Sequence, residues 1–126
     1  MDLQHPAAGT FQFGVFELDA RSGELRRHGQ KVRLPHQSFQ ILVLLLSRPG
    51  DVVTRDELRQ ALWQPDTFVD FDVGLNGAVR RLREALDDSA ASPRLVETLP
   101  RRGYRFIAPV TARAQTAPEY IETAAR

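Results

Sequence analysis

The chain has 126 residues, 42% of them hydrophobic and 26% charged, which suits one globular domain with a hydrophobic core. It has no cysteine and no apolar run near the roughly 20 residues that span a bilayer, so we expect a cytoplasmic protein without disulfides, thiolate metal sites or a membrane segment. The formal net charge is only +1, yet residues 73–110 hold seven basic and four acidic side chains, whereas residues 51–72 hold two and six. This distribution indicates either chance clustering or a basic surface beside an acidic one.

The N-terminal part predicts a small antiparallel sheet. Residues 1–10 show no periodicity and are expected to be disordered. Between residues 11 and 34 the apolar residues alternate, with a slip after Val15 that indicates a bulge or a bend. Turn signals at residues 19–23 and 28–30 divide this stretch into short strands.

Two helices are predicted next. Pro35 suits the first turn of a helix, which Pro49-Gly50 ends. After an extended link at residues 51–53, Thr54 and Glu57 have the spacing of a capping box. The helix that they begin is expected to end near Trp63, because Pro65 follows.

A third helix is predicted over about residues 73–86. Its apolar residues follow steps of four, three and four and form one stripe: Leu75, Val79, Leu82 and Leu86. The opposite side holds Val73, Gly77, Arg80, Arg81 and Glu84, with Asn76 and Arg83 on one flank. Residues 95–99 and 104–107 then predict a hairpin around a turn at residues 100–103, and residues 111–126 a linker or tail.

Arginines on the outer face of a helix, followed by arginines at the tip of a hairpin, suit the binding of double-stranded DNA. A helix fits the major groove, where arginine can bind guanine with two hydrogen bonds. A hairpin can reach the adjacent minor groove, whose negative potential attracts arginine. Two plainer interpretations stay open: a solvated helix face for Arg80, Arg81 and Arg83, and a polar turn for Arg101 and Arg102.

Three stretches resemble a known family. They are LPHQSFQILVLLLSRPGDVVTRDELRQALW, VGLNGAVRRLREALDD and RLVETLPRRGYRFIAPV, within residues 11–110. They resemble the effector domain of OmpR/PhoB-type regulators, most closely the variant of CadC-like and ToxR-like one-component regulators. The resemblance implies an α+β fold: a winged helix-turn-helix with an N-terminal antiparallel sheet, a three-helix core and a C-terminal β-hairpin wing. It also implies a domain spanning residues 11–110 that binds DNA sequence-specifically to regulate transcription.

The resemblance gives the third helix the role of recognition helix in the major groove. Its groove-facing positions would be Asn76, Gly77, Arg80 and Arg81, with Arg83 nearer the phosphates. Gly77 has two readings: it allows a close approach of the backbone to DNA, or it marks a helix that stiffens on binding.

Further contacts are implied outside this helix. Arg55 and the indole N–H of Trp63 match positions that touch phosphate, and Thr98 matches a position that contacts the DNA backbone. Arg101 and Arg102 would occupy the tip of the wing, at the minor groove. For Trp63 simple packing weighs equally, and Tyr104 and Phe106 are expected to pack the wing onto the core.

The loop at residues 64–72 matches the transactivation loop of this family, which can face RNA polymerase. The resemblance implies that Asp66, Asp70 and Asp72 would contact that partner. For the last two, capping of the third helix is the alternative. A module that binds protein through this acidic loop is the runner-up function. The resemblance also implies two copies of the chain on tandem DNA sites.

We expect no enzyme activity, cofactor or metal site, since the three histidines lack ligand spacing and no catalytic constellation stands out.

Overall fold

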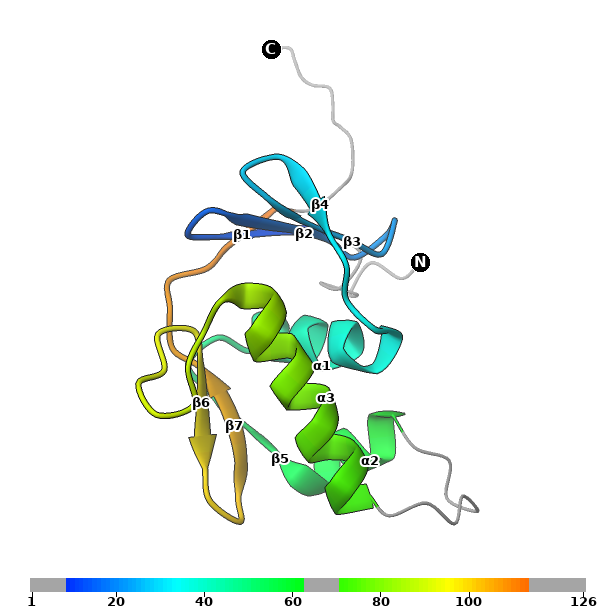
Figure 1. The fold of residues 1–126 in the computed structure, drawn as a ribbon, viewed down its shortest axis with the longest axis vertical. Coiled ribbons are helices and arrows are strands. Elements are labelled where there is room, and N and C mark those ends of the chain that lie inside the picture. Colours follow the sequence, from blue (N-terminus) through cyan, green and yellow to red (C-terminus); the bar gives the residue numbers. More distant parts are fainter. Residues whose placement is uncertain (1–8, 63–70, 114–126) are drawn as a thin grey trace. The chain divides into compact units, whose positions relative to one another are not determined.

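The computed structural model of the chain describes residues 9–62 and 71–113 (Figure 1). These residues form two compact units. Of the described residues, unit 1 contains 9–32 and 109–113, and unit 2 contains 33–62 and 71–108. No helix in this part of the chain is long and apolar enough to cross a membrane.

Unit 1 is a five-stranded antiparallel sheet in the order β4-β3-β2-β1-β8. Its strands are β1 Thr10–Phe13, β2 Phe16–Asp19, β3 Glu24–Arg27, β4 Gln30–Val32 and β8 Thr111–Arg113. The small antiparallel sheet expected from residues 11–34 is confirmed, and the slip in the alternation is a turn at Gly14 and Val15 between β1 and β2.

The structure differs from the sequence expectation at both ends of this sheet. Thr10, expected in a disordered segment, begins β1, and Thr111–Arg113, expected in a linker or tail, form β8. β8 pairs with β1, with Thr10 opposite Arg113. Pairing partners so far apart in the chain leave no local pattern, so periodicity alone did not reveal this edge strand.

The helices of unit 2 are α1 His36–Ser47, α2 Arg55–Leu62 and α3 Phe71–Leu86. α3 begins two residues before the predicted start. The buried Ser38 hydroxyl of α1 donates to the carbonyl of Ala78 in α3, at 2.7 Å, so the contact between these helices leaves no unpaired hydroxyl. The apolar stripe of α3 is buried as predicted, together with Ala78: Leu75, Val79, Leu82 and Leu86.

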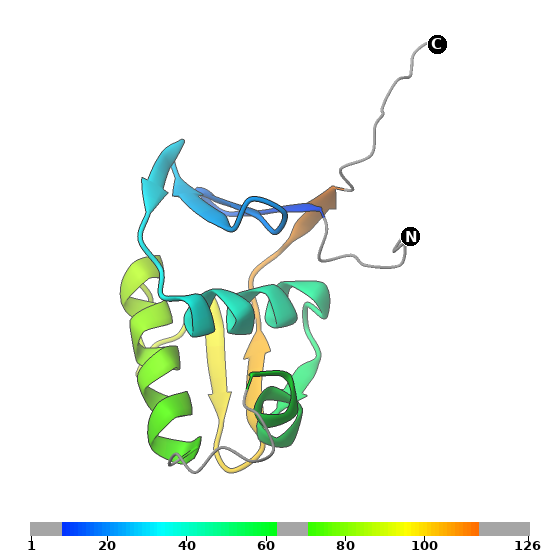
Figure 2. The same ribbon diagram turned by 90° about the vertical axis from the view of Figure 1, so that its right-hand side faces the viewer.

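The wing is part of a three-stranded sheet in the order β5-β7-β6. Its strands are β5 Val52–Thr54, β6 Val96–Leu99 and β7 Gly103–Phe106. β5 occupies the stretch expected as an extended link, and its pairing with β7 anchors the wing in unit 2. The side chains of Tyr104 and Phe106 are buried, as expected. α3 and the β6-β7 hairpin run side by side, with the start of α3 and the hairpin turn at the same end (Figures 1 and 2).

Candidate nucleic-acid interface

The outer face of α3 carries most of the residues expected in the groove. Asn76, Arg80 and Arg81 are exposed, and Gly77 is partly exposed in the middle of the continuous helix. The buried stripe holds the opposite face against the core of unit 2, so these side chains project from a fixed support. Within residues 9–62 and 71–113, neither Arg80 nor Arg81 forms an ion pair, so their guanidinium groups can bind an external anion.

Arg83 joins α3 to the wing. Its Nη2 donates to the carbonyl oxygen of Val96 at 3.0 Å and to the Thr98 hydroxyl at 2.5 Å. Its Nε is buried and has no hydrogen-bond partner in the structure. Arg83 and Thr98, both expected at the DNA backbone, are therefore brought together, with α3 and the wing strand β6 held at one relative position.

A hollow of about 370 Å³ lies between α3 and the wing. Asn76, Arg80 and Arg83 line it from the helix, and Thr98 and Tyr104 line it from the wing. The carboxylates of Glu84 and Asp88 line the hollow as well, so it combines amide, hydroxyl and guanidinium groups, which can bind phosphate and sugar oxygens, with two acidic groups.

The turn at the tip of the wing has a constrained backbone. Arg101 has a φ of 65°, and the Arg102 N–H donates to the carbonyl of Leu99 at 2.9 Å. A Cβ at Gly103 would lie 2.1 Å from the carbonyl oxygen of Val53, so only glycine allows β7 to approach β5 so closely. The side chains of Arg101 and Arg102 are exposed at this tip.

Behind the tip, the wing strands carry a balanced pair of charges. Arg105 on β7 donates from Nε to the Glu97 carboxylate on β6 at 2.9 Å, and from Nη2 to the same oxygen. Because this pair neutralises itself, the positive charge of the hairpin is concentrated at its tip.

Arg55 lies where α2, α3 and the wing tip meet. Its Nη2 is 2.5 Å from Oδ1 of Asp72, in the first turn of α3, and its guanidinium lies over the Phe71 ring, 5.6 Å from the centroid. Its backbone N–H donates to the carbonyl of Arg102 at 3.0 Å. The Asp72 carboxylate therefore contacts a side chain that was expected to bind phosphate.

A second hollow, of about 430 Å³, gathers four arginines at this end of unit 2: Arg55, Arg59, Arg101 and Arg102. Arg59 was not among the residues expected from the sequence. Its position four residues after Arg55, one helical turn further along α2, was the available signal. Arg59 also pairs with Asp56 at 2.8 Å.

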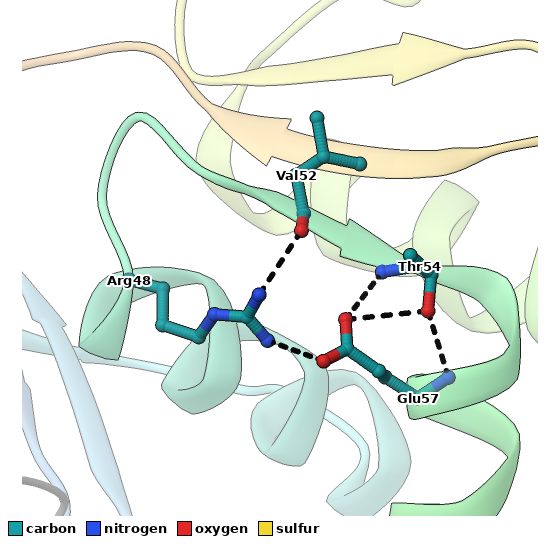
Figure 3. A network of polar contacts seen from close by, with 4 residues as sticks. All are labelled: Arg48, Val52, Thr54 and Glu57. Carbon is teal, nitrogen blue, oxygen red and sulfur yellow. Dashed lines mark hydrogen bonds and ion pairs between the residues drawn. The ribbon is translucent and has the colours of Figure 1, made fainter.

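The capping box of Thr54 and Glu57 stabilises the start of α2 (Figure 3). Arg55 is the first residue of that helix. The Thr54 N–H donates to Glu57 Oε1 at 2.8 Å, and the Glu57 N–H donates to the Thr54 hydroxyl at 3.0 Å. Arg48 adds an ion pair to Glu57 at 2.8 Å and a hydrogen bond to the Val52 carbonyl at 3.2 Å. The bond from the Thr54 N–H, followed by Arg48, holds the pKa of Glu57 below its ordinary value.

Asp88 organises the connection from α3 to β6. Its carboxylate accepts the backbone N–H groups of Arg94 at 2.8 Å, Leu95 at 3.2 Å and Val96 at 2.9 Å. Partial burial raises the pKa of Asp88, but these hydrogen bonds outweigh it and the pKa lies below its ordinary value. Because these partners lie six to eight residues further along the chain, no local pattern in the sequence marks the contacts.

Nine of the ten residues expected to contact DNA line the two hollows or lie on the outer face of α3, Gly77 included. Trp63, the other expected phosphate contact, and two of the loop acids, Asp66 and Asp70, lie outside the described residues. Asp72 is described, and its ion pair with Arg55 places it at the positive end of unit 2 rather than on a separate acidic surface.

A three-helix unit in which α3 lies beside a β-hairpin wing, with exposed arginines on both, has the architecture of a winged-helix DNA-binding domain. Residues 29–106 match the family model described as "Transcriptional regulatory protein, C terminal", and the chain belongs to this family. The OmpR/PhoB-type fold expected from the sequence is confirmed.

Sequence similarity to a known transcriptional activator agrees with this family. The chain is 38% identical over 98 residues to the cholera toxin homolog transcriptional activator of Vibrio parahaemolyticus, which covers 75% of this chain and 34% of that protein. The chain therefore spans about a third of the length of this relative.

Two solved structures resemble it as well. The DNA-binding domain of Klebsiella pneumoniae RstA, solved in complex with the RstA box, is 29% identical, with a TM-score of 0.66 over 78% of this chain and 96% of that one. The DNA-binding domain of Escherichia coli CadC is 26% identical, with a TM-score of 0.68 over 83% of this chain and 97% of that one.

Proposed function

We propose that this chain binds double-stranded DNA sequence-specifically and that it serves transcriptional regulation. The observation that carries the proposal is the joint placement of exposed arginines on α3 and on the adjacent wing tip, in a family whose Klebsiella member was solved on its DNA box. α3 lies in the major groove and the wing reaches the minor groove.

The residues divide between base edges and the DNA backbone. Arg80, Arg81 and Asn76 face the bases, because they are exposed on the outer side of α3. Arg55 and the wing-tip arginines meet phosphates and the minor groove. Thr98 and Arg83 fix the wing against the helix, and a phosphate contact of Arg83 stays a prediction.

Two further expectations depend on residues or copies outside the described part. A contact of the loop at residues 64–72 with RNA polymerase, and a tandem dimer on DNA, stay predictions. Asp72, the one acid of the expected loop within the described residues, lies in the first turn of α3 and pairs with Arg55, which counts against a separate acidic surface for a protein partner there.

The test is selection of bound duplexes from a random library by the full chain, followed by affinity measurements at two salt concentrations. We expect an enriched motif and an affinity that falls steeply with salt. Arg81→Ala should weaken binding to the selected site by about 1 to 3 kcal/mol and relax the sequence preference. Arg33→Ala removes the same charge from an exposed position between β4 and α1 and serves as the matched control.

Absence of an enriched motif, or of binding at low salt, would refute sequence-specific recognition. Equal losses of Arg81→Ala on the selected site and on random DNA would refute base reading by Arg81.

A further inference from the structure

Asn76 is the only asparagine in the chain, and the residue after it is glycine. Its side chain is exposed on α3 and lines the hollow between α3 and the wing. Within residues 9–62 and 71–113, no hydrogen bond holds its amide, so the side chain can rotate. An asparagine loses its amide most readily before glycine, because glycine has no side chain to hinder an attack by its own backbone nitrogen.

The helix restrains this reaction. In an α-helix, the Gly77 N–H is hydrogen-bonded to the carbonyl four residues earlier, and this geometry keeps its nitrogen away from the Asn76 side chain. The attack therefore requires that the first two turns of α3 open. Weakly anchored ends of helices open in this way, on a time scale far shorter than that of a chemical step in the backbone.

The first two turns of α3 are weakly anchored. In residues 71–77 only Leu75 is buried, and the closely spaced buried residues of the helix begin at Ala78. The buried hydrogen bond that ties α3 to α1 is also made at Ala78. The ion pair of Asp72 with Arg55 is exposed and adds only a weak restraint. Four of these seven residues are weak helix formers, which favours opening as well: Val73, Gly74, Asn76 and Gly77.

The chemical step is an intramolecular substitution followed by hydrolysis. The Gly77 backbone nitrogen gives its proton to a base in the solvent and forms a bond to Cγ of Asn76, and the side-chain nitrogen of Asn76 leaves as ammonia. Water then opens the resulting succinimide at one of its two carbonyl groups. Opening at Cγ gives aspartate, whereas opening at the backbone carbonyl gives isoaspartate, so water is the only other reactant.

Both products damage the surface that carries the proposed DNA contacts. An aspartate at this position puts a negative charge one helical turn before Arg80, in a hollow that already contains the carboxylates of Glu84 and Asp88. This charge repels the phosphates of a duplex. Isoaspartate adds one carbon atom to the backbone and so interrupts the helical repeat of α3.

We propose that Asn76 is a deamidation site, that its deamidation removes DNA binding, and that bound DNA protects it. The chemical step is independent of the proposed function, whereas the loss of binding and the protection rest on it. A bound chain keeps α3 closed, because a ligand that binds only the folded state lowers the population of the open one. A chain that stays free loses its DNA-binding surface with age.

The experiment incubates the full chain at neutral pH, alone and with the duplex selected from the random library, and follows Asn76 by peptide mass spectrometry. With the duplex at about a hundred times its dissociation constant, about 1% of the chain is free, so the conversion should be about a hundredfold slower. A random duplex at the same concentration should protect less. In the sample without DNA, the fraction of chain that binds the selected duplex should fall in proportion to the conversion.

Three variants complete the design. Gly77→Ala should slow the conversion by about fivefold or more, because alanine is the better helix former and a Cβ there meets only the end of the Arg81 side chain, at 3.5 Å. Asn76→Asp, which is one of the two products, should bind the selected duplex about 5- to 150-fold more weakly, the range for the loss of one base contact. Gln30→Glu makes the same change from amide to acid at an exposed position in β4 and should bind like the unmodified chain.

The deamidation site is refuted if Asn76 keeps its amide in the free folded chain while the same chain unfolded in urea converts, or if Gly77→Ala converts at an unchanged rate. Equal conversion with and without the selected duplex would refute the protection, and an Asn76→Asp variant that binds like the unmodified chain would refute the loss of binding. If no duplex is selected, the proposed function fails and both of these consequences fail with it, while the mass measurements on the free chain still decide the chemical step.

Discussion

Asp72→Asn should increase the affinity of the chain for DNA. The Asp72 carboxylate holds Arg55 in an ion pair of 2.5 Å at the end of unit 2 where four arginines gather. A DNA phosphate must compete with this carboxylate for the guanidinium and must also approach a like charge. Asparagine keeps the size of the side chain and removes both effects.

The expected magnitude follows from the exposure of the pair. The side chains of Arg55 and Asp72 are 26% and 72% exposed, so solvent screens the pair and its strength is about 0.2 to 1 kcal/mol. Releasing it should tighten DNA binding by up to about fivefold at low salt. The gain should be equal on selected and random duplexes, because phosphate contacts carry no sequence information. The loss of a carboxylate from the first turn of α3 lowers helix stability by about 0.3 to 1 kcal/mol.

The assay measures dissociation constants by fluorescence anisotropy at several salt concentrations for four variants. Asp51→Asn changes charge in the same way at an exposed position between α1 and β5 and controls for net charge. Arg55→Ala and the Arg55→Ala/Asp72→Asn double variant complete a double-mutant cycle. The reasoning is refuted if Asp72→Asn leaves affinity unchanged, if Asp51→Asn gives the same gain, or if the gain is undiminished without Arg55.

Three further predictions concern the wing and the connection that precedes it. Arg83→Ala should lower the free energy of unfolding by about 1 to 2 kcal/mol, because its hydrogen bonds to β6 are lost. If Arg83 also contacts a phosphate, the variant should lower the slope of DNA affinity against salt concentration, on logarithmic scales, by about 0.9. An unchanged slope would leave Arg83 only the role of fixing the wing. Gly103→Ala should lower the free energy of unfolding by about 1 to 3 kcal/mol, and with it the urea midpoint, because the alanine Cβ would meet the Val53 carbonyl. An unchanged midpoint would contradict the close approach of β7 to β5. Asp88→Asn should destabilise the chain at pH 7. The pKa of Asp88 is lower in the folded chain than in the unfolded chain, so its stabilisation is fully present above the unfolded pKa and is lost as the pH falls through the folded pKa. In denaturation curves, the difference in stability between Asp88→Asn and the unmodified chain should therefore shrink toward pH 3. A difference that stays constant with pH would contradict this prediction.

The sequence by itself determined the features that arise from neighbouring residues. The stripe from Leu75 to Leu86 predicted the buried face of α3, because the helical period repeats within a few residues. Thr54 and Glu57 predicted the capping box, whose bonds join residues three apart. The motifs of the third helix and the wing added the family, and with it the order of helices and hairpin.

Tertiary structure alone decided the features that join distant residues. Arg55 meets Asp72 over 17 residues, and Arg83 meets Thr98 over 15, so no local pattern marks either pair. The pairing of β5 with β7, and that of β1 with β8, likewise joins segments that lie far apart in the chain: Val52 pairs with Arg105, and Thr10 pairs with Arg113. Which arginines are held by the protein and which face outward depends on these contacts, because a guanidinium binds whatever acceptor the folded backbone brings within reach.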